Sequence, residues 1–277
     1  YINQTRNDNE EIVLKKVDSD TFIKQHFSKI IAPNLIMVTF LDVETTGVNT
    51  TKDEVIEIGI INVAIEKDTG YLINVTDSYQ ALNEPSIPIP ESATNMNGIT
   101  DQMVKGKKIN WETVHRILMV SEVIIAHNAS FDRAFLDRYL PLSRNKYWGC
   151  TMKDVCWINY GFKGVGLELL CAWHGIWYDA HRGLNDVAAT VSLVAGNHGN
   201  NGAYLLELME VATRQYYQVS VKFNYNPKMQ AALKADGYYF ISDGKSWNKI
   251  GSLAEVENER IKLEQYKSLK GFELYVL

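Results

Sequence analysis

The sequence predicts an α/β domain in which helices pack on a mixed sheet, followed by a small α+β module. Segments 36–44, 55–65 and 70–79 read as a three-stranded meander, and Asp68-Thr69-Gly70 closes a hairpin between the last two. From residue 110 onward, strand and helix patterns alternate, which is typical of helices packed on a sheet. The glycine- and asparagine-rich stretch 196–202 predicts a linker before the second module.

The other elements follow from hydrophobic spacing. Asn110 is placed to cap a helix, and a short buried strand is expected at 123–126. Further helices are expected at 131–140, 153–160, 166–174, 185–195, 203–216 and near 254–269, with a compact segment at 219–250. The chain then divides into an N-terminal arm or docking segment (1–34), the α/β domain (35–198) and the C-terminal module (199–277).

Composition limits the classes of function. The 277 residues carry a formal net charge of −5, which excludes a protein that binds nucleic acid by bulk positive charge alone. No apolar run approaches the ~18–20 residues of a membrane span, so no membrane contact is expected. Cys150, Cys156 and Cys171 are expected as buried thiols in a reducing, cytoplasmic setting, although Cys171 and His174 form a C-x-x-H pair.

Two acidic residues stand at the end of the first strand. Asp42 and Glu44 are two positions apart in "FLDVETTG", so they share one face while Leu41 and Val43 point the other way. Their carboxylates are expected ~6–7 Å apart, where sheets usually bind ligands. Taken alone, the pattern also fits a strand that runs out into solvent through a turn at 45–47.

Two further acidic residues lie at helix starts. Asp132 falls in the first turn after the strand 123–126, and Asp186 begins another helical run. Either carboxylate could serve only to complement the helix dipole. Because Gly183 discourages helix before Asn185, His181 is placed in the loop that leads into this helix. A histidine there could pack in the core or swing into a cleft.

Together, the four carboxylates predict a metal site. Like charges packed side by side cost energy unless a cation neutralises them. Oxygen ligands without cysteine favour Mg²⁺ or Mn²⁺, and two such ions ~3.5–4 Å apart suit hydrolysis at phosphorus. An imidazole titrates near neutral pH, which suits removal of a proton from the attacking water, so His181 is the candidate base.

The ordered motifs "DVETTG", "HNASFD" and "HRGLND" resemble the DEDD superfamily of 3′→5′ exonucleases, in the His-containing branch that includes the proofreading epsilon subunit of bacterial DNA polymerase III and RNase T. The likeness covers residues 36–195, including "IPIPESATNMNGITDQMV", where the family often has His and this chain has Asn97. It implies a ribonuclease H-like fold, with a mixed five-stranded sheet and flanking helices.

The resemblance also implies roles for individual residues. The implied metal ligands are Asp42, Glu44, Asp132 and Asp186, with His181 as general base; the implied substrate contacts are Thr45, Thr46, Gly47, Asn128 and Phe131. Two Mg²⁺ or Mn²⁺ ions and hydrolysis of DNA or RNA to nucleoside 5′-monophosphates follow. The expected partner is a nucleic acid with a free 3′ end, single-stranded DNA in the first place, and a polymerase or other protein is a further expected partner.

Two alternatives stay open. The chain could be a ribonuclease H-like binding module that has lost activity, or a proofreading subunit that acts mainly by binding a polymerase through residues 1–34 or the C-terminus. In the C-terminal module, the segment 233–249 interleaves lysines with aromatic residues. The rings could form the core of a small β-module with a hairpin turn at 242–246, stack the bases of a single strand, or dock a partner protein.

Overall fold

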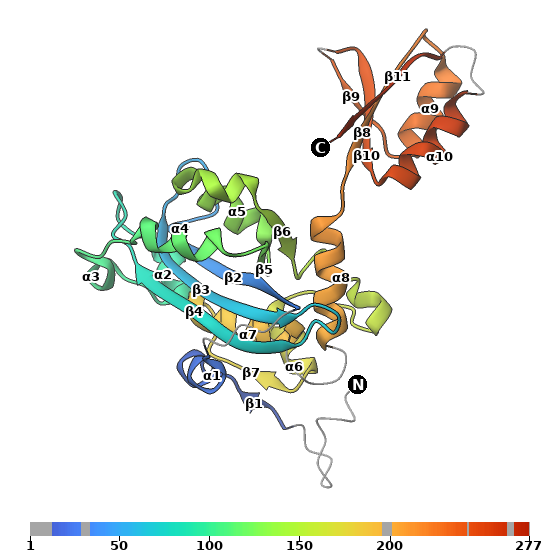
Figure 1. Ribbon diagram of the computed structural model, residues 1–277. Helices are drawn as coiled ribbons and strands as arrows, with labels where there is room; N and C mark the ends of the chain where they lie inside the picture. Colours follow the sequence, from blue (N-terminus) through green and yellow to red (C-terminus); the bar gives the residue numbers. More distant parts are fainter. Residues whose placement is uncertain (1–12, 29–33, 196–200, 243, 265–268, 277) are drawn as a thin grey trace. The chain divides into compact units, whose positions relative to one another are not determined.

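The computed structural model describes residues 13–28, 34–195, 201–242, 244–264 and 269–276 (Figure 1). The chain forms two compact units, Tyr1–Thr213 and Arg214–Leu277. Helix α8 (Asn201–Thr213) packs on α7 and β6 of the first unit. The boundary therefore lies between Thr213 and Arg214 rather than at residue 199. Of the expected linker, residues 196–200 lie outside the described residues.

The first unit is built on a five-stranded sheet of order β4-β3-β2-β5-β6. Its strands are β2 (Leu35–Thr45), β3 (Val55–Glu66), β4 (Leu72–Leu82), β5 (Val123–Ala126) and β6 (Tyr147–Cys150). The first three are antiparallel neighbours, whereas β5 pairs parallel with β2, and β6 pairs parallel with β5. This arrangement confirms the expected mixed sheet of a ribonuclease H-like α/β fold.

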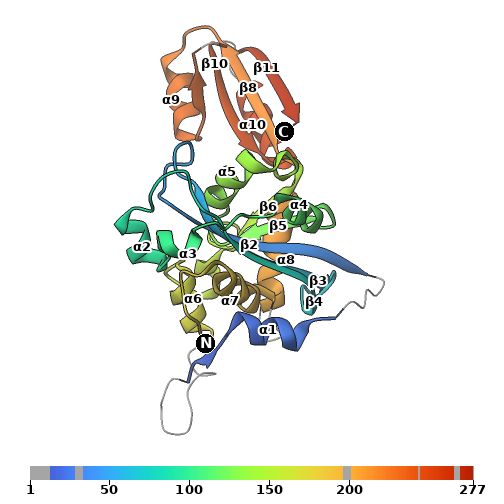
Figure 2. The ribbon, with the colours of Figure 1, turned by 90° about the vertical axis from the view of Figure 1, so that its left-hand side faces the viewer.

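Helices cover both faces of this sheet (Figures 1 and 2). One face carries α1 (Ser19–His26), α6 (Leu167–Trp173), α7 (Gly183–Ala195) and α8; the other carries α4 (Trp111–Met119) and α5 (Ala129–Tyr139). The short helices are α2 (Glu91–Asn97), α3 (Asp101–Val104), η2 (Pro141–Asn145) and η3 (Trp157–Tyr160). Among the described residues, no helix is both long enough and apolar enough to span a membrane.

Side chains of β2 alternate between the two cores, as the sequence predicts. Val38 and Phe40 pack in the core beneath α7, whereas Leu41 and Val43 pack in the core beneath α5. Continuing this alternation places Asp42 and Glu44 on the α7 side, at the point where the apolar part of the strand ends. The pleat of one strand therefore delivers two carboxylates to the same side of the sheet.

The described part of the N-terminal segment packs on the first unit. Strand β1 (Lys15–Lys16) pairs with β7 (Ile176–Trp177), and Phe22 of α1 is buried in the core beneath α7. This packing leaves residues 13–28 in contact with their own domain.

The cysteines agree with the sequence in part. Cys150 and Cys171 are buried free thiols, but Cys156 is exposed, since it lies just before the short η3 helix. His174, in the C-x-x-H pair with Cys171, uses both ring nitrogens in hydrogen bonds to the Leu170 carbonyl and the Tyr204 hydroxyl. The pair therefore does not form half of a zinc site.

The second unit is a four-stranded sheet with two helices. Its elements in chain order are β8 (Tyr217–Phe223), α9 (Pro227–Ala235), β9 (Tyr239–Ile241), β10 (Ser246–Gly251), α10 (Leu253–Glu264) and β11 (Leu269–Val276). Strands β9 and β10 pair antiparallel, as the expected hairpin requires, and residue 243 of its turn lies outside the described residues. Tyr238 and Trp247 belong to the core, as one of the three interpretations predicts, whereas Tyr239 and Phe240 are exposed. Strand β11 was not expected, since the sequence predicted a helix as far as about residue 269 and no element after it.

Candidate active site

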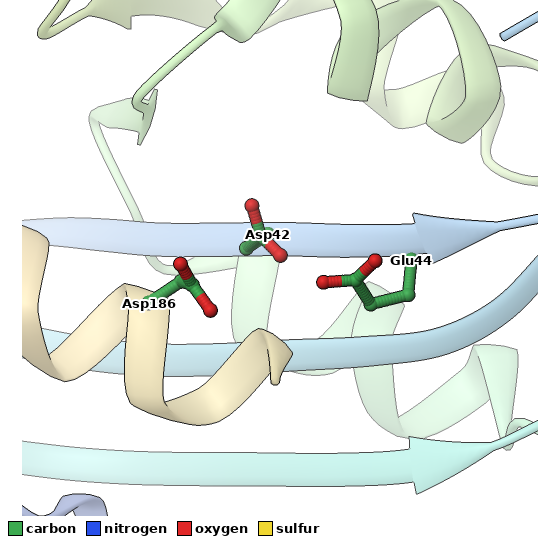
Figure 3. Close-up of side chains that lie close together, drawn as sticks. All are labelled: Asp42, Glu44 and Asp186. Atoms are coloured by element: carbon green, nitrogen blue, oxygen red, sulfur yellow. The ribbon is translucent and has the colours of Figure 1, made fainter. Parts of the chain in front are cut away.

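Three acidic side chains from two distant parts of the chain meet beside β2. Asp42 and Glu44 project from β2, and Asp186 projects from the first turns of α7 (Figure 3). One carboxylate oxygen from each lies within 4.8 Å of the others. Such a group of oxygen atoms can hold a metal ion, and its all-oxygen chemistry suits a hard divalent cation.

Two glycines allow α7 to come this close. Gly59 of β3 is the register partner of Asp42, and the backbone of α7 begins directly above it. A Cβ atom on Gly59 would lie 2.3 Å from the carbonyl carbon of Gly183 and 2.4 Å from the nitrogen of Leu184. Because no real side chain tolerates such distances, glycine at position 59 lets the helix start reach the sheet. That approach brings Asp186 to Asp42.

Asp132 borders this group from the opposite helix layer. It lies in the first turn of α5, is 3% exposed, and its Oδ1 accepts a hydrogen bond of 3.1 Å from the Val43 N–H. β5 pairs with β2 only as far as Phe40, so this edge of β2 is open to the Asp132 carboxylate. The structure therefore gathers three of the four expected ligands tightly and places the fourth against the same strand. Its role as a metal ligand stays a prediction.

Burial and mutual repulsion disfavour the ionised forms of these carboxyl groups. Burial raises the pKa of Glu44 to about 7 and that of Asp132 to about 7. Burial also raises the pKa of Asp186 to about 6, against the hydrogen bond from the Arg182 N–H. The pKa of Asp42 is raised well above its usual range by burial and then by the charges of its acidic neighbours, first Asp132. Bound cations would offset both costs.

His181 lies where the sequence placed it, in the loop before α7. Its side chain is exposed, and its backbone has a φ of 62°, a left-handed conformation that is uncommon for residues other than glycine. It lies five residues before Asp186 in the chain. Helix α7 itself begins at Gly183, two residues before the expected start.

A buried ion pair fixes the residue next to His181. Glu57 of β3 has a side chain that is 0% exposed, and Arg182 donates to its two oxygens at 3.3 Å and 3.1 Å. The Gly183 N–H and the Gln80 amide also donate to Glu57, at 3.1 Å and 2.9 Å. Three of these donors, two from Arg182 and one from Gly183, tie the start of α7 and the end of the His181 loop to β3, and the fourth comes from the neighbouring strand β4.

Neighbouring polar groups orient the acidic side chains. Asp186 Oδ2 accepts from the Arg182 N–H at 2.9 Å, and Oδ1 accepts from the Tyr178 hydroxyl at 3.3 Å. The amide of Asn97 donates to Glu44 Oε2 at 3.2 Å. The asparagine that departs from the family pattern therefore contacts a metal-ligand candidate directly.

The expected substrate contacts lie around this group. Thr45 and Thr46 are buried: the Thr45 hydroxyl donates to the Gly47 carbonyl at 2.7 Å, and the Thr46 hydroxyl donates to Asp53 at 3.3 Å. Asn128 occupies the N-cap position of α5 without a side-chain capping bond, and half-buried Phe131 packs on the ring of Phe135. These contacts hold the loop in shape, and a role in substrate binding stays a prediction.

Sequence reasoning missed the ion pair and the Tyr178 hydroxyl. The sequence did contain a signal for Glu57, because it is the one charged residue in the mostly apolar stretch "VIEIGIINVAI" (55–65). A lone carboxylate in a buried strand needs a partner. The identity of that partner, Arg182, depends on the crossing of α7 over β3 and leaves no mark in local sequence.

Comparison with known proteins identifies the family to which the chain belongs. A profile of the exonuclease family, of the RNase T type, matches residues 39–194. The matched region exceeds half of the chain and contains every acidic residue of the site. The chain belongs to the exonuclease family, which confirms the expected enzyme class.

Its relatives include much longer polymerases. The chain is 30% identical over 159 residues to DNA polymerase III PolC-type of Clostridium perfringens, a match covering 55% of the chain and 10% of that protein. It is 32% identical over 116 residues to the PolC-type polymerase of Caldanaerobacter subterraneus subsp. tengcongensis, covering 41% of the chain and 7% of that protein. A product-bound structure of exonuclease I shares the fold, with a TM-score of 0.50 and 16% identity over 68% of this chain and 51% of that one.

Proposed function

We propose that this chain is a metal-dependent 3′→5′ exonuclease that hydrolyses DNA to nucleoside 5′-monophosphates. The observation that carries the proposal is the convergence of Asp42, Glu44 and Asp186 within 4.8 Å, inside the region that belongs to the exonuclease family. The gathering of these three carboxylates supports an active enzyme over an inactive binding module. The three free cysteines fit a reducing cytoplasmic setting.

The acidic group suits two divalent cations. Asp42, Glu44 and Asp186 would hold them together with Asp132. The Val43 N–H donates to Oδ1 of Asp132, which leaves Oδ2 for a cation. Bound Mg²⁺ or Mn²⁺ would supply Lewis-acid stabilisation of the charge that develops on the phosphate oxygens. The raised pKa values of these carboxylates fit this assignment, because cations would bring them back into the ionised form.

His181 is the proposed general base. It sits on a loop, exposed, and next to a residue that the Glu57–Arg182 ion pair holds in place. The imidazole accepts the proton of the attacking water, while the acidic group would hold the cations that neutralise the phosphodiester. Thr45, Thr46, Gly47, Asn128 and Phe131 form the proposed contacts to the terminal nucleotide.

The test uses oligonucleotides labelled at the 5′ end, as single- and double-stranded DNA and RNA, with Mg²⁺ or Mn²⁺. A ladder that shortens from the 3′ end is expected, and chelator or Asp42→Asn abolishes it. His181→Ala should lose turnover at least a hundredfold while Mn²⁺ affinity, measured by calorimetry, is retained. His115→Ala, at an exposed histidine on α4, is the matched control. Full cleavage by Asp42→Asn would refute the site.

The similarity to PolC-type polymerases supports a second proposal, which concerns a protein partner. Because the chain resembles a part of PolC-type polymerases that covers 10% or less of their length, we propose that it acts together with a DNA polymerase. Co-elution of the chain with the replicative polymerase of its own cell on size-exclusion chromatography is expected. Separate elution at micromolar concentrations of both would refute this partnership and leave the nuclease proposal intact.

A further inference from the structure

The second unit has a topology that occurs in nucleic-acid-binding domains. Its elements follow the order strand, helix, strand, strand, helix, strand, and its sheet has the order β11-β8-β10-β9 with every neighbouring pair antiparallel. This is the ferredoxin-like arrangement. RNA recognition motifs, which are four-stranded sheets, stack two or three bases on one face. Topology alone does not assign function, which depends on the side chains that the sheet exposes.

Both helices pack on the same face of this sheet (Figure 1). Val219, Val221 and Trp247 point toward Met229 and Leu233 of α9 and toward two residues of α10, Val256 and Leu263. Because side chains alternate along a strand, the intervening residues of β8 and β10 point to the opposite face. Neither α9 nor α10 contributes to that face, which we call the open face. It is defined here by Ser220, Lys222, Tyr239, Asn248, Ile250, Glu273 and Tyr275; Ser220 and Asn248 at its centre are buried, and the others lie around them.

The register arranges the open face as a shallow platform between two rings. Tyr239 on the edge strand β9 pairs with Asn248, which pairs with Ser220 on β8. Tyr275 on the other edge strand pairs with Gln218. The two tyrosines, 45% and 48% exposed, therefore stand three strand spacings and two residues apart, about 16 Å, on either side of small polar side chains. Buried aromatic residues cannot stack on a ligand, whereas these two can.

Charge points to the occupant. The second unit contains ten lysine and arginine residues against seven aspartate and glutamate residues, although the whole chain has a net charge of −5. Lys222 lies exposed on the open face. The acidic residue of that face, Glu273, accepts a hydrogen bond of 2.5 Å from the Tyr275 hydroxyl. Exposed rings beside an ammonium group match the bases and phosphates of a single strand.

We propose that the open face binds single-stranded nucleic acid, with bases stacked on Tyr239 and Tyr275 and a phosphate at Lys222. The choice of nucleic acid over a protein partner rests in part on the proposed nuclease function of the first unit. The site is separate from the acidic group and uses no metal. It gives the chain a second contact with a strand beyond the terminal nucleotide.

The test measures binding of a 5′-labelled oligo(dT) of about 15 nucleotides by fluorescence anisotropy, on the full chain with Asp42→Asn and chelator so that the probe is not degraded. Tyr239→Ala with Tyr275→Ala should weaken binding at least about tenfold, since each stacked base contributes a factor of roughly five or more. Tyr239→Phe with Tyr275→Phe should retain binding, because stacking needs the ring and not the hydroxyl. Tyr225→Ala is the matched control, at a tyrosine that is 84% exposed in the loop before α9.

Unchanged affinity in the double alanine variant, or an equal loss in Tyr225→Ala, would overturn the proposal and favour a protein as the partner of this face. If the alanine variants unfold, Lys222→Glu serves instead, with an expected loss of affinity and a weaker salt dependence. The two proposals fail separately. A parent chain that binds through the two rings but never shortens a probe refutes the nuclease function alone, and a parent that shortens probes without using the rings refutes the open face alone.

Discussion

The Glu57–Arg182 ion pair makes a prediction whose size follows from the structure. Arg182→Leu leaves the buried Glu57 carboxylate with two neutral donors, the Gly183 N–H and the Gln80 amide. Removing one partner of a fully buried pair costs ~3–5 kcal/mol. The arginine side chain is 41% exposed and two donors stay, so we expect a loss of about 2–3 kcal/mol in the free energy of unfolding.

The opposite change is expected to be milder. Glu57→Gln keeps the shape and an acceptor for the Gly183 N–H, and the half-exposed Arg182 can turn its charge to water. We expect a loss of about 1 kcal/mol. The double variant should then be more stable than the sum of the single losses indicates, with a coupling of ~1–2 kcal/mol, because no carboxylate is left buried without its cation.

Urea unfolding followed by tryptophan fluorescence measures these values. Five of the six tryptophans lie in the first unit, so the signal reports mainly on that unit. Arg116→Leu is the matched control, since Arg116 pairs with Asp77 at 2.9 Å on the surface, where such a pair contributes ~0–1 kcal/mol. If Arg182→Leu costs no more than Arg116→Leu, or if the two single losses simply add, the ion pair does not hold the start of α7.

Two further predictions concern charge and packing at the site. In chelator, the melting temperature should fall as pH rises from about 5 to 8. Glu44 and Asp132 have a folded pKa of about 7 and Asp186 one of about 6, all above the ~4 of unfolded carboxylates, so their stabilising contribution is lost as they ionise. Mn²⁺ should restore it, and a flat profile in chelator would contradict the raised pKa values. Gly59→Ala should cost more than about 2 kcal/mol and weaken Mn²⁺ binding at least tenfold, because its Cβ atom would meet the backbone of Gly183. Gly166→Ala, with open space around its Cβ atom and no positive φ, is the control, and equal behaviour of the two would refute the role of the close approach.

Sequence could predict what depends on period and order. The alternation of β2 places Asp42 and Glu44 on one face whatever surrounds them, and the chain order of strands and helices limits the sheet to few topologies. Contacts made by crossing elements are different in kind. Arg182 meets Glu57 across 125 residues, and Asn97 meets Glu44 across 53. No spacing rule links such pairs, so only the packed structure shows them. Strand β11 was missed for a related reason, since its stability comes from pairing with β8 rather than from its own pattern.

The position of Asp186 allows one side chain to accept a hydrogen bond at the helix start and also to serve as the proposed metal ligand. Its Oδ2 accepts the Arg182 N–H at the helix start, while its carboxylate also belongs to the acidic group. Each carboxylate oxygen has two lone pairs, so one side chain can serve both. Asp186→Asn retains a carbonyl acceptor for that N–H and, in chelator at pH 5 where the Asp186 carboxyl is mostly protonated, should change stability by less than about 0.5 kcal/mol, yet it should lose Mn²⁺ binding at pH 8. Asp186→Ala should lose binding and about 1 kcal/mol as well. Equal destabilisation of the two variants would show that the hydrogen bond to Arg182 stabilises nothing, and unchanged Mn²⁺ affinity in Asp186→Asn would remove Asp186 from the ligands.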